Sequence, residues 1–204
     1  MTPKRVDVLE GYRLDAPDIL SAFEDVSSAD VYAHVTHLLP RTPALVADIG
    51  AGTGRDAAWF ASQGHKVLAV EPTEFLRNSG RDLHTSEDIT WLDDKLPELS
   101  RTIELGCSFD CVTLCGVWHH LLDAERAIAM PQLARLLKSG GRLILSLRHG
   151  PGAPRRPCHP STKEGTIALA ARSKLDVLFS CESESVLPAN RARGVTRTWL
   201  VFQR

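Results

Sequence analysis

The sequence predicts an α/β fold in which a doubly wound, mostly parallel sheet is covered by helices on both faces. Short apolar runs of strand length alternate with stretches whose apolar residues recur at helical spacing. One such run, Leu45–Ile49, leads directly into a glycine-rich turn. A continuous apolar run bounded by turn residues is typical of a strand buried on both faces. Strands that alternate with helices are joined by right-handed crossovers, which produce a parallel sheet.

The elements follow one another in a regular order. Residues 16–23 are apolar at helical spacing, and Ser28 precedes a second helical pattern that continues to Leu39, before Pro40. We expect strands at 45–49, 66–70, 89–92, 109–114, 142–147, 175–181 and 196–202. We expect further helices at 55–63, 74–83, 123–138 and 163–173. The helix at 123–138 is expected to be interrupted near Pro131 and to end at the Ser139-Gly140-Gly141 turn.

Length and composition indicate one globular domain. The chain has 204 residues, of which 43% are hydrophobic and 24% charged. The formal net charge of -1 argues against an extensive nucleic-acid surface. No apolar run approaches the ~18 residues of a membrane span. The five cysteines include no CxxC pair, which favours a reducing compartment. We therefore expect a single cytoplasmic domain over residues 1–204 with no membrane segment.

The clearest chemical motif is the glycine-rich turn DIGAGTG at residues 48–54. Glycines let the chain turn tightly, and the free N–H groups at the start of the next helix face a bound ligand. Glu71 ends the second expected strand, where a carboxylate can accept both hydroxyls of a ribose. The GxGxG spacing differs from the GxGxxG of dinucleotide sites. Asp48 would repel a pyrophosphate but pair with an ammonium group, which favours S-adenosylmethionine as the ligand.

Five segments over roughly residues 44–147 resemble the class I S-adenosylmethionine-dependent methyltransferases in order and position. DIGAGTG at 48–54 looks like the first motif of this family, and VLAVEP at 67–72 looks like the second. WLDD at 91–94 is similar to the adenine-binding segment. FDCVTLCGVWHHL at 109–121 and LARLLKSGGRLILSL at 133–147 resemble the regions of the fourth and fifth strands. The resemblance implies a seven-stranded sheet with an antiparallel last strand, a core at 44–204 and an N-terminal helical lid at 1–43.

The resemblance also assigns roles to particular residues. Asp48 and the glycine turn would hold the amino-acid end of the cofactor, Glu71 the ribose, and Asp93, or alternatively Asp94, the adenine. By analogy with the lid, Tyr12 and Arg13 would reach the methionine carboxylate. The expected cofactor-binding residues are Tyr12, Asp48, Gly50, Ala51, Gly52, Gly54, Glu71, Pro72, Leu92, Asp93, Asp94 and Cys115.

Residues after the fourth and fifth strands are expected to face the methyl acceptor. His119 and His120 can take a proton from a hydroxyl or amine, although either can instead cap or pack against the sheet. Methyl transfer can also proceed by positioning alone. The expected substrate-binding residues are Trp118, Arg148 and His149. The basic loop at 148–159 suits an acidic or phosphorylated small substrate, or is simply a solvated surface loop. Cys158, His159 and His149 match no zinc spacing, so no metal site is expected.

These observations predict a methyltransferase that acts on an O, N or S nucleophile of a small molecule. The sheet and cofactor site use most of the chain, which leaves too little surface for a separate recognition domain. Two alternatives remain: a nucleotide-linked oxidoreductase on a similar sheet, and a non-catalytic S-adenosylmethionine-binding module. The identity of the acceptor and the oligomeric state do not follow from the sequence.

Overall fold

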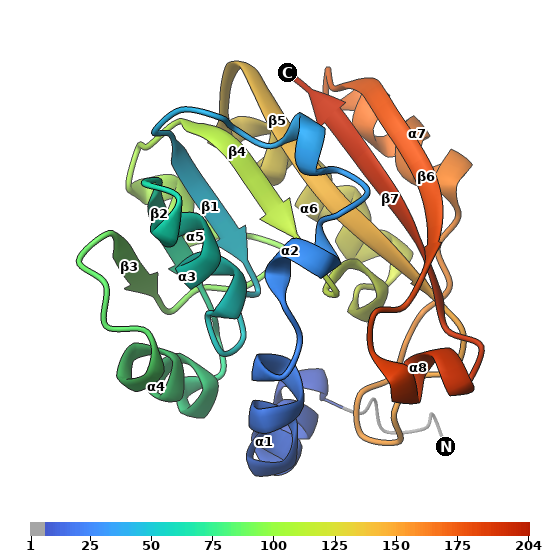
Figure 1. The fold of residues 1–204 in the computed structure, drawn as a ribbon. Helices are drawn as coiled ribbons and strands as arrows, with labels where there is room; N and C mark the ends of the chain where they lie inside the picture. Colours follow the sequence, from blue (N-terminus) through green and yellow to red (C-terminus); the bar gives the residue numbers. More distant parts are fainter. Residues whose placement is uncertain (1–6) are drawn as a thin grey trace.

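A seven-stranded sheet forms the centre of the protein (Figure 1). The computed structural model describes residues 7–204, apart from the side chains of residues 16 and 17. The strand order is β3-β2-β1-β4-β5-β7-β6. The strands are β1 Leu45–Ile49, β2 Lys66–Val70, β3 Ile89–Leu92, β4 Phe109–Leu114, β5 Leu137–His149, β6 Asp176–Glu184 and β7 Thr196–Gln203. Only β7 runs antiparallel to its neighbours β5 and β6, so the predicted fold class is confirmed.

Helices cover both faces of the sheet. The α-helices are α1 Val8–Glu24, α2 Ser28–Val31, α3 Arg55–Ser62, α4 Glu74–Leu83, α5 Ser100–Glu104, α6 Asp123–Leu136, α7 Lys163–Arg172 and α8 Pro188–Ala192. Two 3-10 turns, η1 Thr36–Leu38 and η2 Trp118–His120, complete the list. Core residues of α6 and α7 pack on one face, and those of α2 and α3 pack on the other. Helix α1 lies against α4, where Ile19 meets Leu76.

Strand β1 shows why its apolar run is continuous. Val46 points into the cluster formed with α3, whereas Ala47 and Ile49 point into the cluster formed with α6. Successive side chains of a strand face opposite sides, so a strand covered on both faces needs apolar residues on both faces. The buried Asp48, next to the last residue of β1, is the exception. The run then ends at the edge of the sheet where β1, β2 and β4 all terminate. The glycine turn therefore lies beside the ends of its two neighbouring strands.

The N-terminal segment differs from the sequence prediction. Helix α1 begins at Val8, earlier than expected, and the second expected helix is reduced to α2 and the η1 turn. The apolar residues of this stretch are nevertheless buried, with Tyr32 and Val35 both at 0% exposure. The Tyr32 ring packs against Trp199 and Phe60 of the core. These residues are thus buried by packing against aromatic side chains of the core, although the helix does not continue through them.

Helix α6 and strand β5 also correct the prediction. Helix α6 continues through Pro131, because Met130 and Leu133 on either side are fully buried and hold the backbone against the core. The expected stop at Ser139-Gly140-Gly141 lies within β5, which begins at Leu137. Gly140 has a φ of +76° and donates its N–H to the Arg204 carbonyl, so these glycines form an irregular start to the strand.

Two short helices, α5 and α8, were not predicted from the sequence. Each has five residues, too few to show a helical period. Helix α8 matters for the site, because it lies near the C-terminal end of β5 and the start of β7 (Figure 1). Within residues 7–204, none of the helices combines the length and apolarity that membrane spanning requires.

Candidate active site

A central cavity of about 1270 Å³ opens at the edge of the sheet where the parallel strands end. The turns after β1, β2 and β4 line it, together with α1, the loop after β5 and residues near α8. Crevices at this edge are the usual ligand sites of open α/β sheets. Predicted site residues that line the cavity are Tyr12, Asp48, Gly50, Ala51, Gly52, Glu71, Pro72, Asp94, Cys115, His119, His120 and Arg148.

The glycine turn needs its glycines for two different reasons. Gly50 and Gly52 line the cavity with φ of +74° and +58°, values that other residues rarely adopt. A Cβ on Gly50 would lie 2.5 Å from Val117 Cγ2. Gly54, with φ +83°, precedes α3 and does not line the cavity; a Cβ there would lie 2.5 Å from the Trp91 ring. Gly54 therefore leaves room for the Trp91 ring of β3 at the start of α3.

Glu71 ties the turn after β1 to the turn after β2. Its Oε2 accepts from the Gly52 N–H at 2.8 Å, and its Oε1 accepts from the Thr73 N–H at 2.7 Å. Arg77 donates to the Glu71 carbonyl oxygen at 2.7 Å, which fixes the backbone as well. Burial raises the pKa of Glu71, although these hydrogen bonds oppose the change. The carboxylate is thus held in one orientation at the cavity surface.

Asp48 and Asp56 add two more buried carboxyl groups. Asp48 is 3% exposed and accepts from Thr113 Oγ1 at 2.9 Å. Burial, together with the neighbouring Asp56, raises the pKa of Asp48 to about 7. Asp56 accepts hydrogen bonds from Ser28 and Tyr32 and pairs with Arg55 at 2.7 Å. A positively charged group beside Asp48 would offset the free-energy cost of ionising this buried carboxyl group.

The two candidates for an adenine contact occupy different places. Asp93 is about half-exposed, does not line the cavity, and lies 3.4 Å from Arg77 and 3.6 Å from Arg101. Asp94 lines the cavity and accepts from the Thr102 N–H and Oγ1, both at 2.7 Å. Leu92 does not line the cavity either. The geometry therefore reverses the order of preference given by the sequence and favours Asp94.

His119 and His120 occupy the η2 turn after β4, and their rings lie 4.0 Å apart between centroids. His120 Nδ1 lies 2.9 Å from the Pro157 carbonyl, which only accepts, so Nδ1 bears the proton. His120 Nε2 then accepts from the Tyr12 hydroxyl at 3.0 Å. His119 Nδ1 is buried without a hydrogen-bond partner. Burial lowers the pKa of His120 to about 4 and that of His119 well below its usual value, so both rings are neutral at pH 7.

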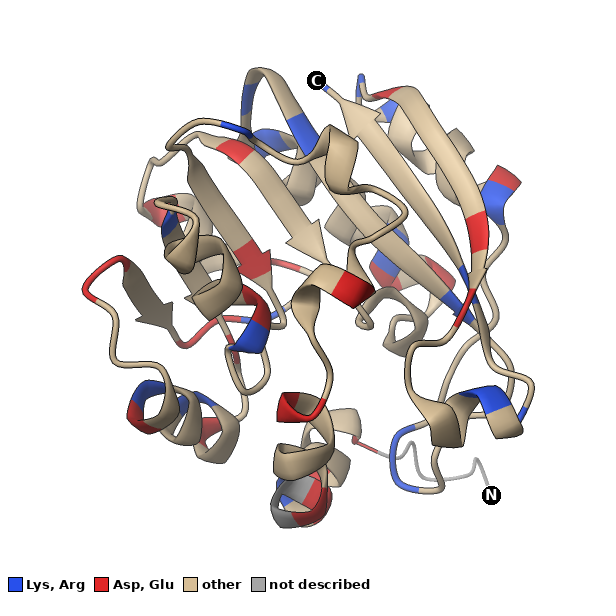
Figure 2. Ribbon diagram, in the orientation of Figure 1, with Lys and Arg blue, Asp and Glu red and all other residues tan. Residues whose placement is uncertain are grey.

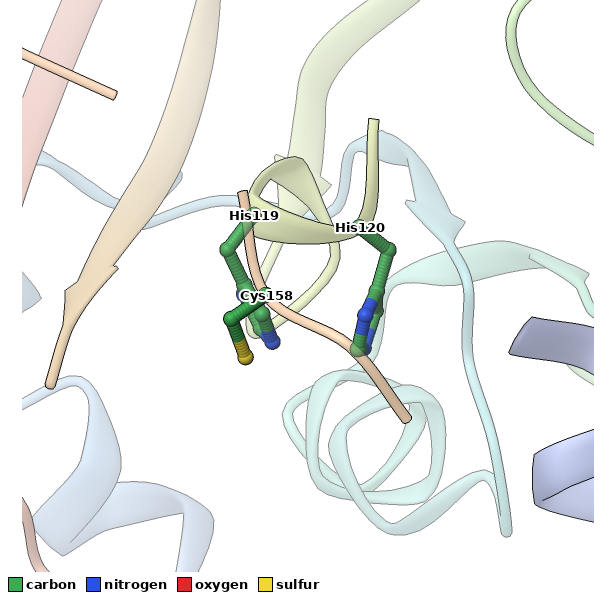
Figure 3. Close-up of side chains that lie close together, drawn as sticks. All are labelled: His119, His120 and Cys158. Atoms are coloured by element: carbon green, nitrogen blue, oxygen red, sulfur yellow. The ribbon is translucent and has the colours of Figure 1, made fainter. Parts of the chain in front are cut away.

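Cys158 joins the two histidines, a grouping that the sequence did not predict. One ligand atom from each residue lies within 4.8 Å of the others, and Figure 3 shows the three side chains pointing the same way. This spacing approaches that of a metal site, but Arg148 Nη1 lies 3.5 Å from Cys158 Sγ. A fixed positive charge at that distance opposes binding of a metal cation.

The loop after β5 is fixed against η2 by a buried arginine. Arg126 of α6 is 2% exposed and donates to the carbonyl oxygens of His159 and Pro160, both at 2.7 Å. The His159 N–H donates to the His119 carbonyl at 2.7 Å. These contacts explain why Cys158 and the histidines meet although 38 positions separate Cys158 from His120.

Two of the three expected substrate-binding residues lie outside the cavity. Trp118 is fully buried in the core beside α6 and does not line the cavity, which corrects the sequence prediction. His149 Nε2 lies 2.8 Å from Thr198 Oγ1, and His149 does not line the cavity. Arg148 does line it. Sequence reasoning also missed Arg193, which lines the cavity from the turn after α8, and Arg197 of β7, which the pairing of β7 with β5 places beside Arg148.

Helix α1 closes one side of the cavity. Tyr12 and Phe23 both line it, whereas Arg13 points outward and pairs with Glu10 at 2.5 Å. The Arg13 side chain is 59% exposed, so the expected contact between Arg13 and a cofactor carboxylate is not present. Asp15 lies 2.9 Å from Arg155 and 3.1 Å from Arg156, which joins α1 to the loop after β5.

Comparison with known proteins identifies relatives of the central part of the chain. Residues 47–145 match the family described as "Methyltransferase domain". An uncharacterized methyltransferase of Bacillus mycoides is 25% identical over 127 residues, which cover 60% of this chain and 58% of that protein. The chain therefore spans less than two thirds of the length of the curated relatives that it matches.

Solved structures share the fold over nearly the whole chain. A TehB-like SAM-dependent methyltransferase from Corynebacterium glutamicum is 21% identical, with a TM-score of 0.65 and coverage of 96% of this chain and 97% of that one. The 1,6-didemethyltoxoflavin-N1-methyltransferase of Burkholderia thailandensis, solved with its substrate and S-adenosylhomocysteine, is 21% identical, with a TM-score of 0.68 and coverage of 100% and 93%. A methyltransferase from Mesorhizobium loti is 17% identical, with a TM-score of 0.69 and coverage of 87% and 99%.

Proposed function

Because residues 47–145 match the family described as "Methyltransferase domain", we propose that the protein is a class I S-adenosylmethionine-dependent methyltransferase that transfers the methyl group of this cofactor to a nucleophilic O, N or S atom of a small molecule. The observation that supports the proposal most strongly is the division of charge within one cavity. Buried carboxyl groups at the ends of β1 and β2 face a cationic side formed by β5, β7 and the neighbouring loops. Figure 2 shows acidic positions at the end of β1 and basic positions on α8 and the loop beside it.

The acidic half fits the cofactor. The N–H groups of the glycine turn and the carboxylate of Asp48 would hold the amino-acid end, because Asp48 is buried and its raised pKa falls when a cation approaches. Glu71 would accept the ribose hydroxyls with the lone pairs that its two backbone hydrogen bonds leave free. Asp94 would meet the adenine, since it lines the cavity and Asp93 does not. When bound, S-adenosylmethionine supplies an electrophilic methyl group.

The histidine pair provides a group that can receive a proton from the acceptor. His119 is neutral, lines the cavity and forms no side-chain hydrogen bond within the described residues. His120 already accepts from Tyr12 and is held by Pro157, so its role is to orient Tyr12 at the cavity surface. We therefore place His119 as the base for acceptors whose nucleophile must lose a proton, whereas positioning suffices for the others.

Helix α1 supports an acceptor of small size. Tyr12, Phe23 and the ion pairs of Asp15 close the cavity on the side away from the sheet. A cavity of about 1270 Å³ has room for the cofactor and a compact molecule. In this proposal residues 1–43, of which the structure describes 7–43, act as the lid of a single domain, and residues 44–204 form its core. A cytoplasmic location belongs to the same proposal and is supported by five cysteines that are all unpaired.

The test is a methyl-transfer assay on the full chain. The purified protein is incubated with S-adenosylmethionine carrying a deuterated methyl group and with a panel of small phenols, carboxylic acids, amines and thiols. We expect S-adenosylhomocysteine and one labelled acceptor to appear together by mass spectrometry, and Glu71→Ala to reduce both. Exposed Glu74→Ala serves as the matched control. If the protein binds the cofactor but forms S-adenosylhomocysteine with none of these compounds, the enzymatic proposal is contradicted. The protein would then be a non-catalytic binding module.

A further inference from the structure

Two arginines face each other across the antiparallel pair of β5 and β7. Arg148 and Arg197 are direct partners in the register of these strands, so their side chains stand on the same face of the sheet. Like charges in this arrangement repel one another. Both side chains line the central cavity, and Arg193 lines it from the turn after α8. Three arginines from neighbouring elements therefore line one cavity.

None of these three arginines forms an ion pair with a carboxylate in the part of the chain that the structure describes. Arg148 donates to the Gly150 and Pro151 carbonyls and to Cys158 Sγ. Arg193 donates to the Gly152 carbonyl at 2.8 Å. These partners satisfy N–H groups but do not neutralise the charges.

Arg197 is the least satisfied of the three. Its Nη1 lies 3.6 Å from Cys115 Sγ, a weak acceptor, and its Nε is buried with no partner. By contrast, Arg55 and Arg156, which line the same cavity, pair with Asp56 and Asp15. A buried guanidinium N–H without an acceptor destabilises the protein unless a ligand supplies one.

We propose that the acceptor has an anionic group, a carboxylate or a phosphate, and that this group binds at an anion subsite formed by Arg148, Arg193 and Arg197. A guanidinium presents planar pairs of N–H donors that match both anions. The inference rests on the proposed function, because the subsite adjoins the histidines at which the acceptor would react. A bound anion would also give the unpartnered Nε of Arg197 an acceptor, and its negative charge would offset the repulsion between Arg148 and Arg197.

The subsite lies several strands away from Glu71, the proposed ribose ligand, whereas the expected cofactor-binding residue Cys115 lies 3.6 Å from Arg197. Glu71 follows β2, and the sheet order places β1, β4 and β5 between β2 and β7. At about 4.8 Å per strand, the ends of β2 and β7 lie roughly 19 Å apart. The cavity therefore has room for a nucleoside at one end and an anionic acceptor at the other. His119 follows β4, which lies between β2 and β7 in the sheet. Burial is the main cause that lowers the pKa of His119, and His120, Arg148 and Arg197 lower it further.

The subsite can be tested by isothermal titration of the full chain saturated with S-adenosylhomocysteine. The probes are inorganic phosphate, 4-hydroxybenzoate and the neutral isostere 4-hydroxybenzamide. We expect at least one anion to bind, and the benzoate to bind at least tenfold more tightly than the amide if the carboxylate is the preferred group. Arg197→Gln should weaken binding of that anion at least tenfold, and Arg197→Lys should restore part of the affinity. Arg172→Gln, an exposed arginine on α7, is the matched control and should have no effect.

A parallel titration with S-adenosylhomocysteine separates the two proposals. If Arg197→Gln binds S-adenosylhomocysteine as wild type does but loses the anion, the subsite is supported. Loss of S-adenosylhomocysteine affinity in this variant would overturn the inference, because Arg197 would then serve the cofactor carboxylate. Absence of anion binding, or equal anion binding by wild type and Arg197→Gln, would also overturn it. Failure of wild type to bind S-adenosylhomocysteine would instead contradict the proposed function.

Discussion

Replacing Asp48 with Asn is expected to make the ligand-free protein more stable at alkaline pH while weakening its affinity for the cofactor. The ordinary pKa of an aspartate is 3.8, and burial beside Asp56 raises that of Asp48 to about 7. Each pKa unit corresponds to ~1.36 kcal/mol, so the buried charge lowers the free energy of unfolding by about 4 kcal/mol once both states are ionised. Asn at this position has no charge to bury.

The sign of the pH dependence follows from the raised pKa. Below pH 3.8 Asp48 is protonated in both states, and between 3.8 and about 7 only the unfolded chain ionises, so wild type loses stability as the pH rises through this range. Between pH 5 and pH 8 the advantage of Asp48→Asn over wild type should therefore grow by roughly 2–3 kcal/mol.

Urea denaturation of both proteins at pH 5 and pH 8, followed by tryptophan fluorescence, measures this difference. Thr113→Val is the control, because it removes the hydrogen bond to Asp48 but keeps the carboxyl group, and so should retain the pH dependence. Titration with S-adenosylhomocysteine at pH 8 should show at least a tenfold loss for Asp48→Asn, about the contribution of one charged hydrogen bond. An equal advantage of Asp48→Asn at both pH values would show that folding does not raise the pKa of Asp48.

Three further predictions address the other parts of the site. Glu71→Gln should bind S-adenosylhomocysteine roughly tenfold to a hundredfold more weakly by calorimetry, because a neutral amide replaces a charged acceptor worth ~1.5–3 kcal/mol; an unchanged affinity would exclude Glu71 as a cofactor ligand. If His120 must be neutral for turnover, the rate at saturating S-adenosylmethionine should stay level as the pH falls and decline only near the lowered pKa of about 4; a decline near pH 6.5 at saturating cofactor would contradict the proposed environment. Asp15→Asn should weaken the contact of α1 with Arg155 and Arg156 and speed amide hydrogen exchange in α1; exchange identical to wild type would show that these ion pairs do not hold the helix.

Local sequence pattern predicted most strands well because each lies between strong turn residues. The bounds of β2, β3 and β4 and of helix α4 agree with the prediction. In these segments, the apolar pattern and the tertiary packing favour the same conformation. The glycine turn was also located correctly, because Gly50 and Gly52 adopt positive φ values that glycine favours and that a local sequence pattern can indicate.

The errors lie where packing outweighs local preference. Pro131 removes one hydrogen bond of α6, but the buried neighbours Met130 and Leu133 keep the helix continuous. Trp118 follows a motif strand and therefore suggested a pocket residue, yet its volume fills the core beneath η2. Neither outcome depends on spacing along the chain, so neither was available to a sequence argument.

The acceptor side of the site was predicted least well, because its residues meet only through long-range pairing. Arg148 was identified because it directly follows the strand expected at 142–147, whereas its partner Arg197 is 49 positions later in the chain. Cys158 reaches the histidines because Arg126 fixes the intervening loop. Strand register and loop packing set these contacts, and neither leaves a periodic pattern in the sequence.

Isothermal titration of the ligand-free full chain with S-adenosylhomocysteine, with NADH as the competing ligand, measures whether the cavity is an S-adenosylmethionine site. We predict saturable binding of S-adenosylhomocysteine with one molecule per chain, loss of this binding in Glu71→Ala, and no binding of NADH. Absence of S-adenosylhomocysteine binding, or saturable binding of NADH at the same site, would contradict the assignment of the cavity to S-adenosylmethionine.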